Sequence, residues 1–141
     1  MIQPRKLMSS IRNTIIKNEV NMSDIENSKK MALMAMEALE DRKGIDVHAI
    51  DISEISTLAD YFIIANGTNS SQVQAMADSV QDALGRAGYL TKNVEGYESA
   101  NWILLDFGDI IVHVFDSENR VFYDLERIWR DGKPIDKDSL N

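Results

Sequence analysis

Cysteine is absent from this chain of 141 residues, which excludes disulfides, thiolate metal sites and cysteine nucleophiles together. No apolar run approaches the roughly 18 residues that a membrane span needs. Positive charge is also scarce, because 15 lysines and arginines stand against 23 aspartates and glutamates, for a net charge of −8. Such a chain is poorly suited to neutralising phosphates. We therefore expect basic partners, no membrane and no direct nucleic-acid specificity.

Net charge is unevenly distributed along the chain. Residues 1–21 hold four basic residues and one acidic residue, a net charge of +3, which leaves −11 for the remaining 120 of the 141 residues. Three interpretations stay open: a start placed upstream of a natural beginning at Met22, a basic arm that docks elsewhere, or a mitochondrial transit peptide. We predict a flexible basic extension over 1–21, an α/β domain over 22–130 and a polar, frayed tail over 131–141.

Hydrophobic periodicity predicts the order α-β-β-α-β-β-β-α. The first helix begins with a capping-box pattern, Ser23 and Glu26, and the segment 61–66 is apolar without interruption, which suggests a strand buried on both faces. The fold class is therefore α/β, with a mixed sheet of about five strands and helices packed mainly on one face. The predicted helices cover residues 23–42, 73–87 and 121–129, and the predicted strands cover residues 46–52, 61–66, 90–94, 102–107 and 110–115.

The last two strands form a predicted hairpin whose faces differ. Gly108 and Asp109 are its two-residue loop, and glycine in the first loop position is typical of a type II′ turn. Since side chains alternate along a strand, one face is wholly apolar and should lie in the core: Ile103, Leu105, Phe107, Ile110, Val112 and Val114. The other face is mixed: Trp102, Leu104, Asp106, Ile111, His113 and Phe115.

Two interpretations of this mixed face compete. Another helix of the chain packs on it, or much of it stays open and meets a partner. We favour the second, because an apolar patch with a tryptophan and a charged rim is typical of the centre of an interface. The residues that lead into the hairpin would then form a polar rim, namely Glu95, Tyr97, Glu98 and Asn101.

Signals for catalysis are weak. His48 and His113 lie on different predicted strands without a third ligand, which makes a zinc site improbable. The turn from Gly67 to Ser70 precedes a helix and resembles an anion-binding turn, but we favour the simpler interpretation, a helix cap with an ordinary turn. A metal-dependent nucleotidyltransferase that uses this turn with Asp106 and Asp109 stays the enzymatic alternative. We predict no catalytic residue, no metal and no cofactor.

Three segments in order closely resemble the ribosomal silencing factor family, RsfS, also called the Iojap family. They cover residues 59–68, 94–115 and 122–129, and the resemblance runs from about Asp24 to Trp129. It implies a nucleotidyltransferase-like α/β fold that lacks that enzyme's active site. It also implies binding to a large-subunit ribosomal protein, called L-fourteen, and a steric block on joining of the small subunit. Family members are described as oligomers, usually dimers, and organelle versions exist.

Residues and resemblance together predict a non-enzymatic repressor of translation in the bacterial cytoplasm, with organelle targeting by residues 1–21 as a minor alternative. The residues after 21, with a net charge of −11, would attract a basic ribosomal protein. The mixed face with its rim would bind it. We expect a homodimer when the protein is free. A third alternative is a homo-oligomer in which the mixed face pairs only with itself.

Overall fold

The computed structural model describes residues 22–117 and 132–140. The third predicted helix, over 121–129, and the basic extension, over 1–21, lie outside these residues. Within them, the structure contains two α-helices, six strands and one short 3₁₀ helix. The elements are α2 (Met22–Asp41), β1 (Ile45–Asp51), β2 (Tyr61–Gly67), α3 (Ser70–Arg86), β3 (Asn93–Glu95), β4 (Trp102–Asp106), β5 (Ile110–Asp116), β6 (Lys133–Ile135) and η2 (Lys137–Leu140).

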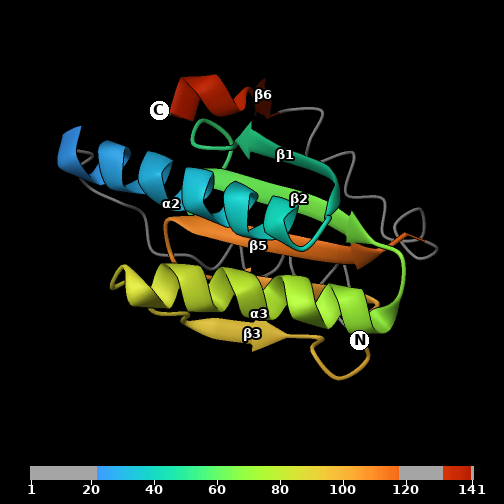
Figure 1. Ribbon diagram of the computed structural model, residues 1–141. Coiled ribbons are helices and arrows are strands. Elements are labelled where there is room, and N and C mark those ends of the chain that lie inside the picture. Colours follow the sequence, from blue (N-terminus) through green and yellow to red (C-terminus); the bar gives the residue numbers. More distant parts are fainter. Residues whose placement is uncertain (1–21, 118–131, 141) are drawn as a thin grey trace.

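The six strands form one mixed sheet with the order β3-β4-β5-β2-β1-β6. β2 and β5 run parallel, with Tyr61 opposite Ile110 and Gly67 opposite Asp116, whereas the other neighbouring pairs are antiparallel. Figure 1 shows β3 at one margin of the sheet and β6 at the other. The predicted α/β class with a mixed sheet is therefore confirmed, with one more strand than expected.

The extra strand comes from the segment predicted to be frayed. β6 pairs with β1, with Ile135 opposite Ala49, and Leu140 in η2 is buried in the main core. The prediction of a frayed tail is thus wrong for residues 132–140. A strand of three residues is too short to show periodicity, and Pro134 argues against a central strand but is tolerated at an edge.

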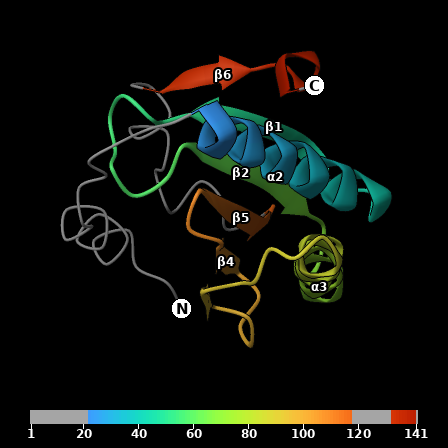
Figure 2. The same ribbon diagram turned by 90° about the vertical axis from the view of Figure 1, so that its left-hand side faces the viewer.

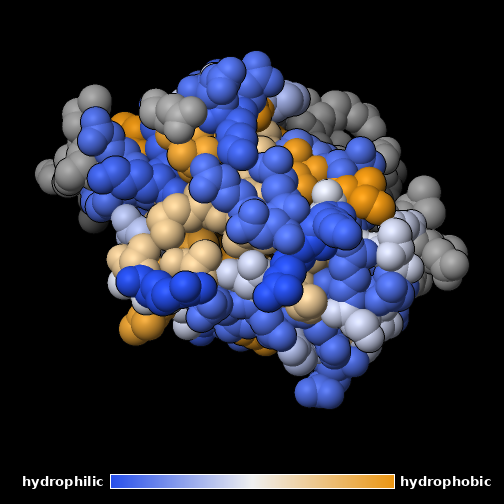
Figure 3. All heavy atoms as spheres, viewed as in Figure 1, coloured by the Kyte–Doolittle hydropathy of each residue, from blue (hydrophilic) through white to orange (hydrophobic). Residues whose placement is uncertain are grey.

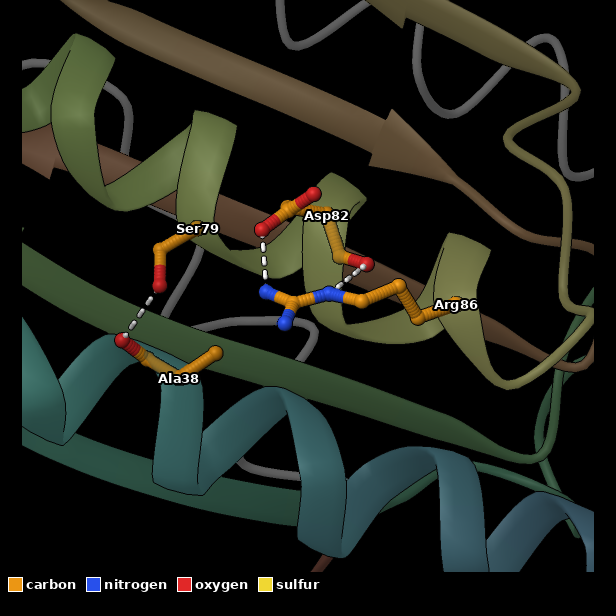
Figure 4. Close-up of polar contacts among 4 residues, drawn as sticks. All are labelled: Ala38, Ser79, Asp82 and Arg86. Atoms are coloured by element: carbon orange, nitrogen blue, oxygen red, sulfur yellow. Dashed lines mark hydrogen bonds and ion pairs between the residues drawn. The ribbon is translucent and has the colours of Figure 1, made fainter.

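Both described helices pack on the same face of the sheet (Figure 2). Small side chains allow α2 to approach α3, and the Ser79 hydroxyl donates to the Ala38 carbonyl oxygen of α2 at 3.2 Å (Figure 4). Farther along α3, Arg86 forms an exposed ion pair with Asp82. The buried alanines under and between the helices are Ala32, Ala35, Ala38 and Ala77.

The helix ends follow local chemistry. α3 begins after Asn69, whose side chain accepts a hydrogen bond from the Gln72 amide at 2.9 Å, as an N-cap residue does. α2 ends at Asp41, and a Cβ at Gly44 would lie 2.8 Å from the Leu39 carbonyl oxygen. Only glycine therefore fits where the chain turns from α2 into β1.

Candidate partner-binding site

The β4–β5 hairpin has the predicted register and turn. Trp102 lies opposite Phe115 and Asp106 lies opposite Ile111. Gly108, the first loop residue, has φ +90°, which a type II′ turn requires at that position. The Gly108 amide also donates to Asp106 Oδ1 at 2.8 Å, so this carboxylate holds the turn.

The apolar face of the hairpin lies in the core beneath α2 and α3, as predicted. Its six side chains belong to one buried cluster together with residues from both helices. The sequence pattern was sufficient here, because strict alternation leaves these positions only one face to occupy.

The mixed face is buried as well, and the prediction of an open patch is wrong for its large side chains. Trp102, His113 and Phe115 are 0% exposed, Ile111 is 1% exposed and Leu104 is 4% exposed. Asp106 alone of this face is partly exposed.

The buried hydrophobic side chains of this face belong to a second hydrophobic cluster. Side chains of β1 and β2 continue the mixed face, and Leu58 from the β1–β2 connection packs against them. A continuous apolar surface this wide is costly to leave in water. The unbroken apolar segment 61–66 was the signal for burial on both faces. The members of this second cluster are Ile50, Ile52, Ala59, Phe62, Ile64, Trp102, Leu104, Ile111 and Phe115.

The second cluster encloses a polar contact. Trp102 Nε1 donates to His113 Nδ1 at 3.0 Å, and the Phe62 ring meets the imidazole edge-on, with 4.7 Å between centroids. Burial lowers the pKa of His113 to about 3, so the ring is neutral and its proton sits on Nε2. Nε2 and the Asn66 Oδ1 atom are buried without a hydrogen-bond partner in the described part of the chain.

The predicted rim lies at the surface. Glu98 is exposed, whereas Glu95, Tyr97 and Asn101 are half-buried. The segment is fixed to α3, because the Gln74 side chain donates to the Tyr97 carbonyl oxygen at 2.9 Å.

Two more features belong to this rim, a tyrosine–aspartate hydrogen bond and an unusual backbone angle. The Tyr97 hydroxyl donates to Asp78 Oδ2 at 3.1 Å, and this hydrogen bond raises the pKa of Tyr97. Ala100 takes a left-handed φ of +53° while fully buried, a conformation that costs a residue with a Cβ about 1 kcal/mol. Backbone strain of this kind concentrates at functional sites.

Apolar side chains adjoin the rim at the β3 edge. Leu90 is 77% exposed and Val94 is 37% exposed. Figure 3 shows a largely hydrophilic helix-bearing surface with hydrophobic atoms in several places, at its upper part and in smaller areas at its lower margin, on the side of β3. An acidic rim beside exposed aliphatic side chains is the arrangement expected where a basic protein docks.

The residues of the enzymatic alternative are not brought together. Asp109 lies at the beginning of β2, where its carbonyl oxygen accepts from the Asp60 amide at 2.8 Å. Gly67 is at the opposite end of the seven-residue strand β2, about 20 Å away at the rise of an extended strand. The turn after Gly67 serves as the cap of α3. Among residues 22–117 and 132–140, no three carboxylate or histidine side chains form a metal-binding group.

Comparison with known proteins decides the family. Residues 25–141 match the family model described as "Ribosomal silencing factor during starvation".

The chain belongs to the RsfS family.

Among curated relatives, RsfS of Bacillus subtilis is 39% identical over 112 residues, which cover 79% of this chain and 95% of that protein. The chloroplastic Iojap protein of Zea mays is 28% identical over 118 residues, 83% of this chain and 51% of that protein. A crystal structure from Chromobacterium violaceum superposes with a TM-score of 0.70 at 42% identity, covering 75% of this chain and 88% of that one. A crystal structure from Bacillus halodurans gives a TM-score of 0.69 at 36% identity, covering 76% and 97%.

The described helices show one further property. None in the described ranges is long and apolar enough to cross a membrane.

Proposed function

We propose that this RsfS-family protein silences ribosomes by binding the large subunit through the ribosomal protein L-fourteen and sterically blocking the small subunit. The observation that carries the proposal is the family match over residues 25–141. A steric block requires only bulk at the right place, so no catalytic group is needed. We accordingly propose a non-enzymatic protein of the bacterial cytoplasm.

The rim residues and the β3 edge are the proposed contact. Asp78 and Glu98 place two carboxylates near Tyr97, and Glu95 adds a third in β3 opposite Leu104. Leu90 and Val94 are exposed apolar side chains just before and in β3. Opposite charge steers the encounter with a basic ribosomal protein. The exposed aliphatic side chains would stabilise the complex, because binding removes their apolar surface from water.

The buried members of the mixed face take a supporting role in this proposal. Trp102 begins β4, the strand that follows the rim. It stacks against Phe115 of β5, with 5.3 Å between the ring centroids. Tyr97, Asn101 and Asp106 are half-buried, so they complete the contact at its border. The sheet beneath the contact is stabilised by the buried side chains of Leu104, Ile111 and His113.

Co-sedimentation with purified large subunits tests the contact. The double variant Glu95→Lys, Glu98→Lys should weaken binding by about tenfold or more, since each reversed charge replaces an attraction by a repulsion. Glu37→Lys, at an exposed site on α2, is the matched control and should bind normally. Full binding by the double variant would reject the rim as the contact.

Subunit joining and solution size complete the test. Wild-type protein should reduce the formation of complete ribosomes from purified subunits, and the double variant should not.

We propose a homodimer for the free protein. Light scattering measures its size before and after large subunits are added. A melting shift with nucleotide and magnesium would instead support the enzymatic alternative.

A further inference from the structure

A cavity of about 460 Å³, lined mostly by polar and charged residues, lies between the first half of α2 and the β1–β2 connection. It sits at the beginning of β2, whereas the cap of α3 lies at the other end of that strand. The proposed ribosome contact uses neither α2 nor this connection, so the cavity is a separate feature. Its lining residues are Ile25, Ser28, Lys29, Asp51, Ser53, Ser56, Thr57, Asp60 and Tyr61.

The lining is rich in hydrogen-bond acceptors. Five of the nine residues carry hydroxyl groups, two carry carboxylates and one, Lys29, carries an ammonium. The carboxylates are held in place from within the lining. Ser28 Oγ donates to Asp60 Oδ2 at 2.6 Å, and Asp51 Oδ1 accepts from both the amide and the hydroxyl of Ser53, at 2.8 and 2.6 Å.

Tyr61 supplies an independent observation. Its side chain is buried, with only 6% exposed, yet its hydroxyl makes no hydrogen bond to any residue that the structure describes, and it lines the cavity. Burial, followed by the charges of Asp51 and Asp60, raises the pKa of Tyr61. The hydroxyl therefore stays protonated, and the potential around it is negative despite the nearby Lys29.

We propose that this cavity binds a guanidinium group. A guanidinium presents five donors in a rigid plane, which suits acceptors spread over a carboxylate, several hydroxyls and a phenol. The negative potential disfavours phosphates and other anions. The cavity volume falls within the range of small-ligand pockets, so it accommodates the group together with an aliphatic stem.

Two sources supply this chemistry, a free small guanidine or an arginine side chain of a protein. Titration of the isolated full-length protein by NMR distinguishes them, with methylguanidine in one arm and an N-acetylated, C-amidated Ala-Ala-Arg-Ala-Ala peptide in the other. Equal affinity in both arms identifies a small-molecule site, and much tighter peptide binding identifies a site for an arginine side chain. Either result supports the cavity, and neither depends on ribosome binding.

The expected result is saturable shifts of the amides of residues 51–61, with Kd about 1 mM or tighter. Asp51→Asn should weaken binding about tenfold, because it removes a charged acceptor, and Tyr61→Phe should weaken it less. Asp136→Asn, at an exposed site outside the cavity, is the control and should bind as the wild type does. Thermal melting of each variant verifies folding.

Three results would overturn the proposal. They are the absence of saturable shifts with both ligands, equal binding of a peptide with glutamine in place of arginine, and preferential binding of inorganic phosphate. Unchanged affinity in a folded Asp51→Asn variant would also exclude the carboxylate as the recognition group.

Discussion

The two faces of the sheet are both largely buried, and they differ chemically. The face under α2 and α3 is filled by aliphatic, aromatic and small side chains. The opposite face is also buried, but it contains His113 and Asn66, each with a buried polar atom that lacks a partner in the described part of the chain. Burial therefore does not mean complete satisfaction of polar groups. Unpaired buried polar atoms lower the stability of the folded protein. The face that holds His113 and Asn66 therefore includes a destabilising feature that the face under the helices does not show in the described residues.

The largest expected effect tests whether the second face is a true core. Trp102→Ala should lower the free energy of unfolding by about 4 kcal/mol, because it removes a fully buried indole. Leu105→Ala, on the opposite face of the same strand, should cost about 3 kcal/mol. Urea unfolding measures both. A cost below about 1 kcal/mol for Trp102→Ala would mean that the face is open in solution.

The next prediction uses the pH dependence of the free energy of unfolding to distinguish the two faces. His113 remains neutral in the folded protein because burial lowers its pKa from 6.5 to about 3, whereas the unfolded chain binds a proton near pH 6.5. The unfolded state thus binds more protons below that pH, and stability falls as the pH falls. Between pH 7 and pH 5 the loss due to this group should be about 2 kcal/mol.

His113→Phe provides the comparison for that prediction. Urea unfolding at both pH values should show a pH dependence smaller by about 2 kcal/mol in the variant. The carboxylates contribute equally to both proteins, so the difference isolates the imidazole. An identical pH dependence in the two proteins would show that His113 is accessible to protons in the folded state.

The smallest effect concerns the first face. Ser79→Ala removes the hydrogen bond to the Ala38 carbonyl oxygen between α3 and α2 (Figure 4), and should cost about 0.5–1 kcal/mol in thermal unfolding. Asp82→Ala, which breaks the exposed pair with Arg86, should change stability by less than about 0.5 kcal/mol. A larger loss for Asp82→Ala would show that surface charge contributes to the helix-bearing face.

Local patterns in the sequence predicted most of the fold. The spacing of Val73, Met76, Ala77 and Val80 predicted a helix, and these four side chains are buried in α3. The glycine at position 108 predicted the hairpin turn and hence the register of Trp102 with Phe115. These predictions succeed because turn geometry and side-chain alternation are decided within a few residues.

The candidate site was predicted less well. The hairpin pattern grouped Trp102 with His113 correctly, and they are hydrogen-bonded. Whether their face is open depends on what lies against it, which hairpin periodicity does not encode. The cavity beside Tyr61 escaped sequence reasoning entirely, because its residues come from a helix, a connection and two strands with no motif in common.

The sequence by itself determined the two described helices, most of the described strands, the hairpin register and the family resemblance, since each depends on neighbouring residues or on a continuous motif. Only the tertiary structure decided that both sheet faces are buried, that β6 joins β1, and that Asp109 lies at the end of β2 opposite to Gly67. These outcomes depend on contacts between segments far apart in the chain, where packing, rather than local pattern, selects the neighbours.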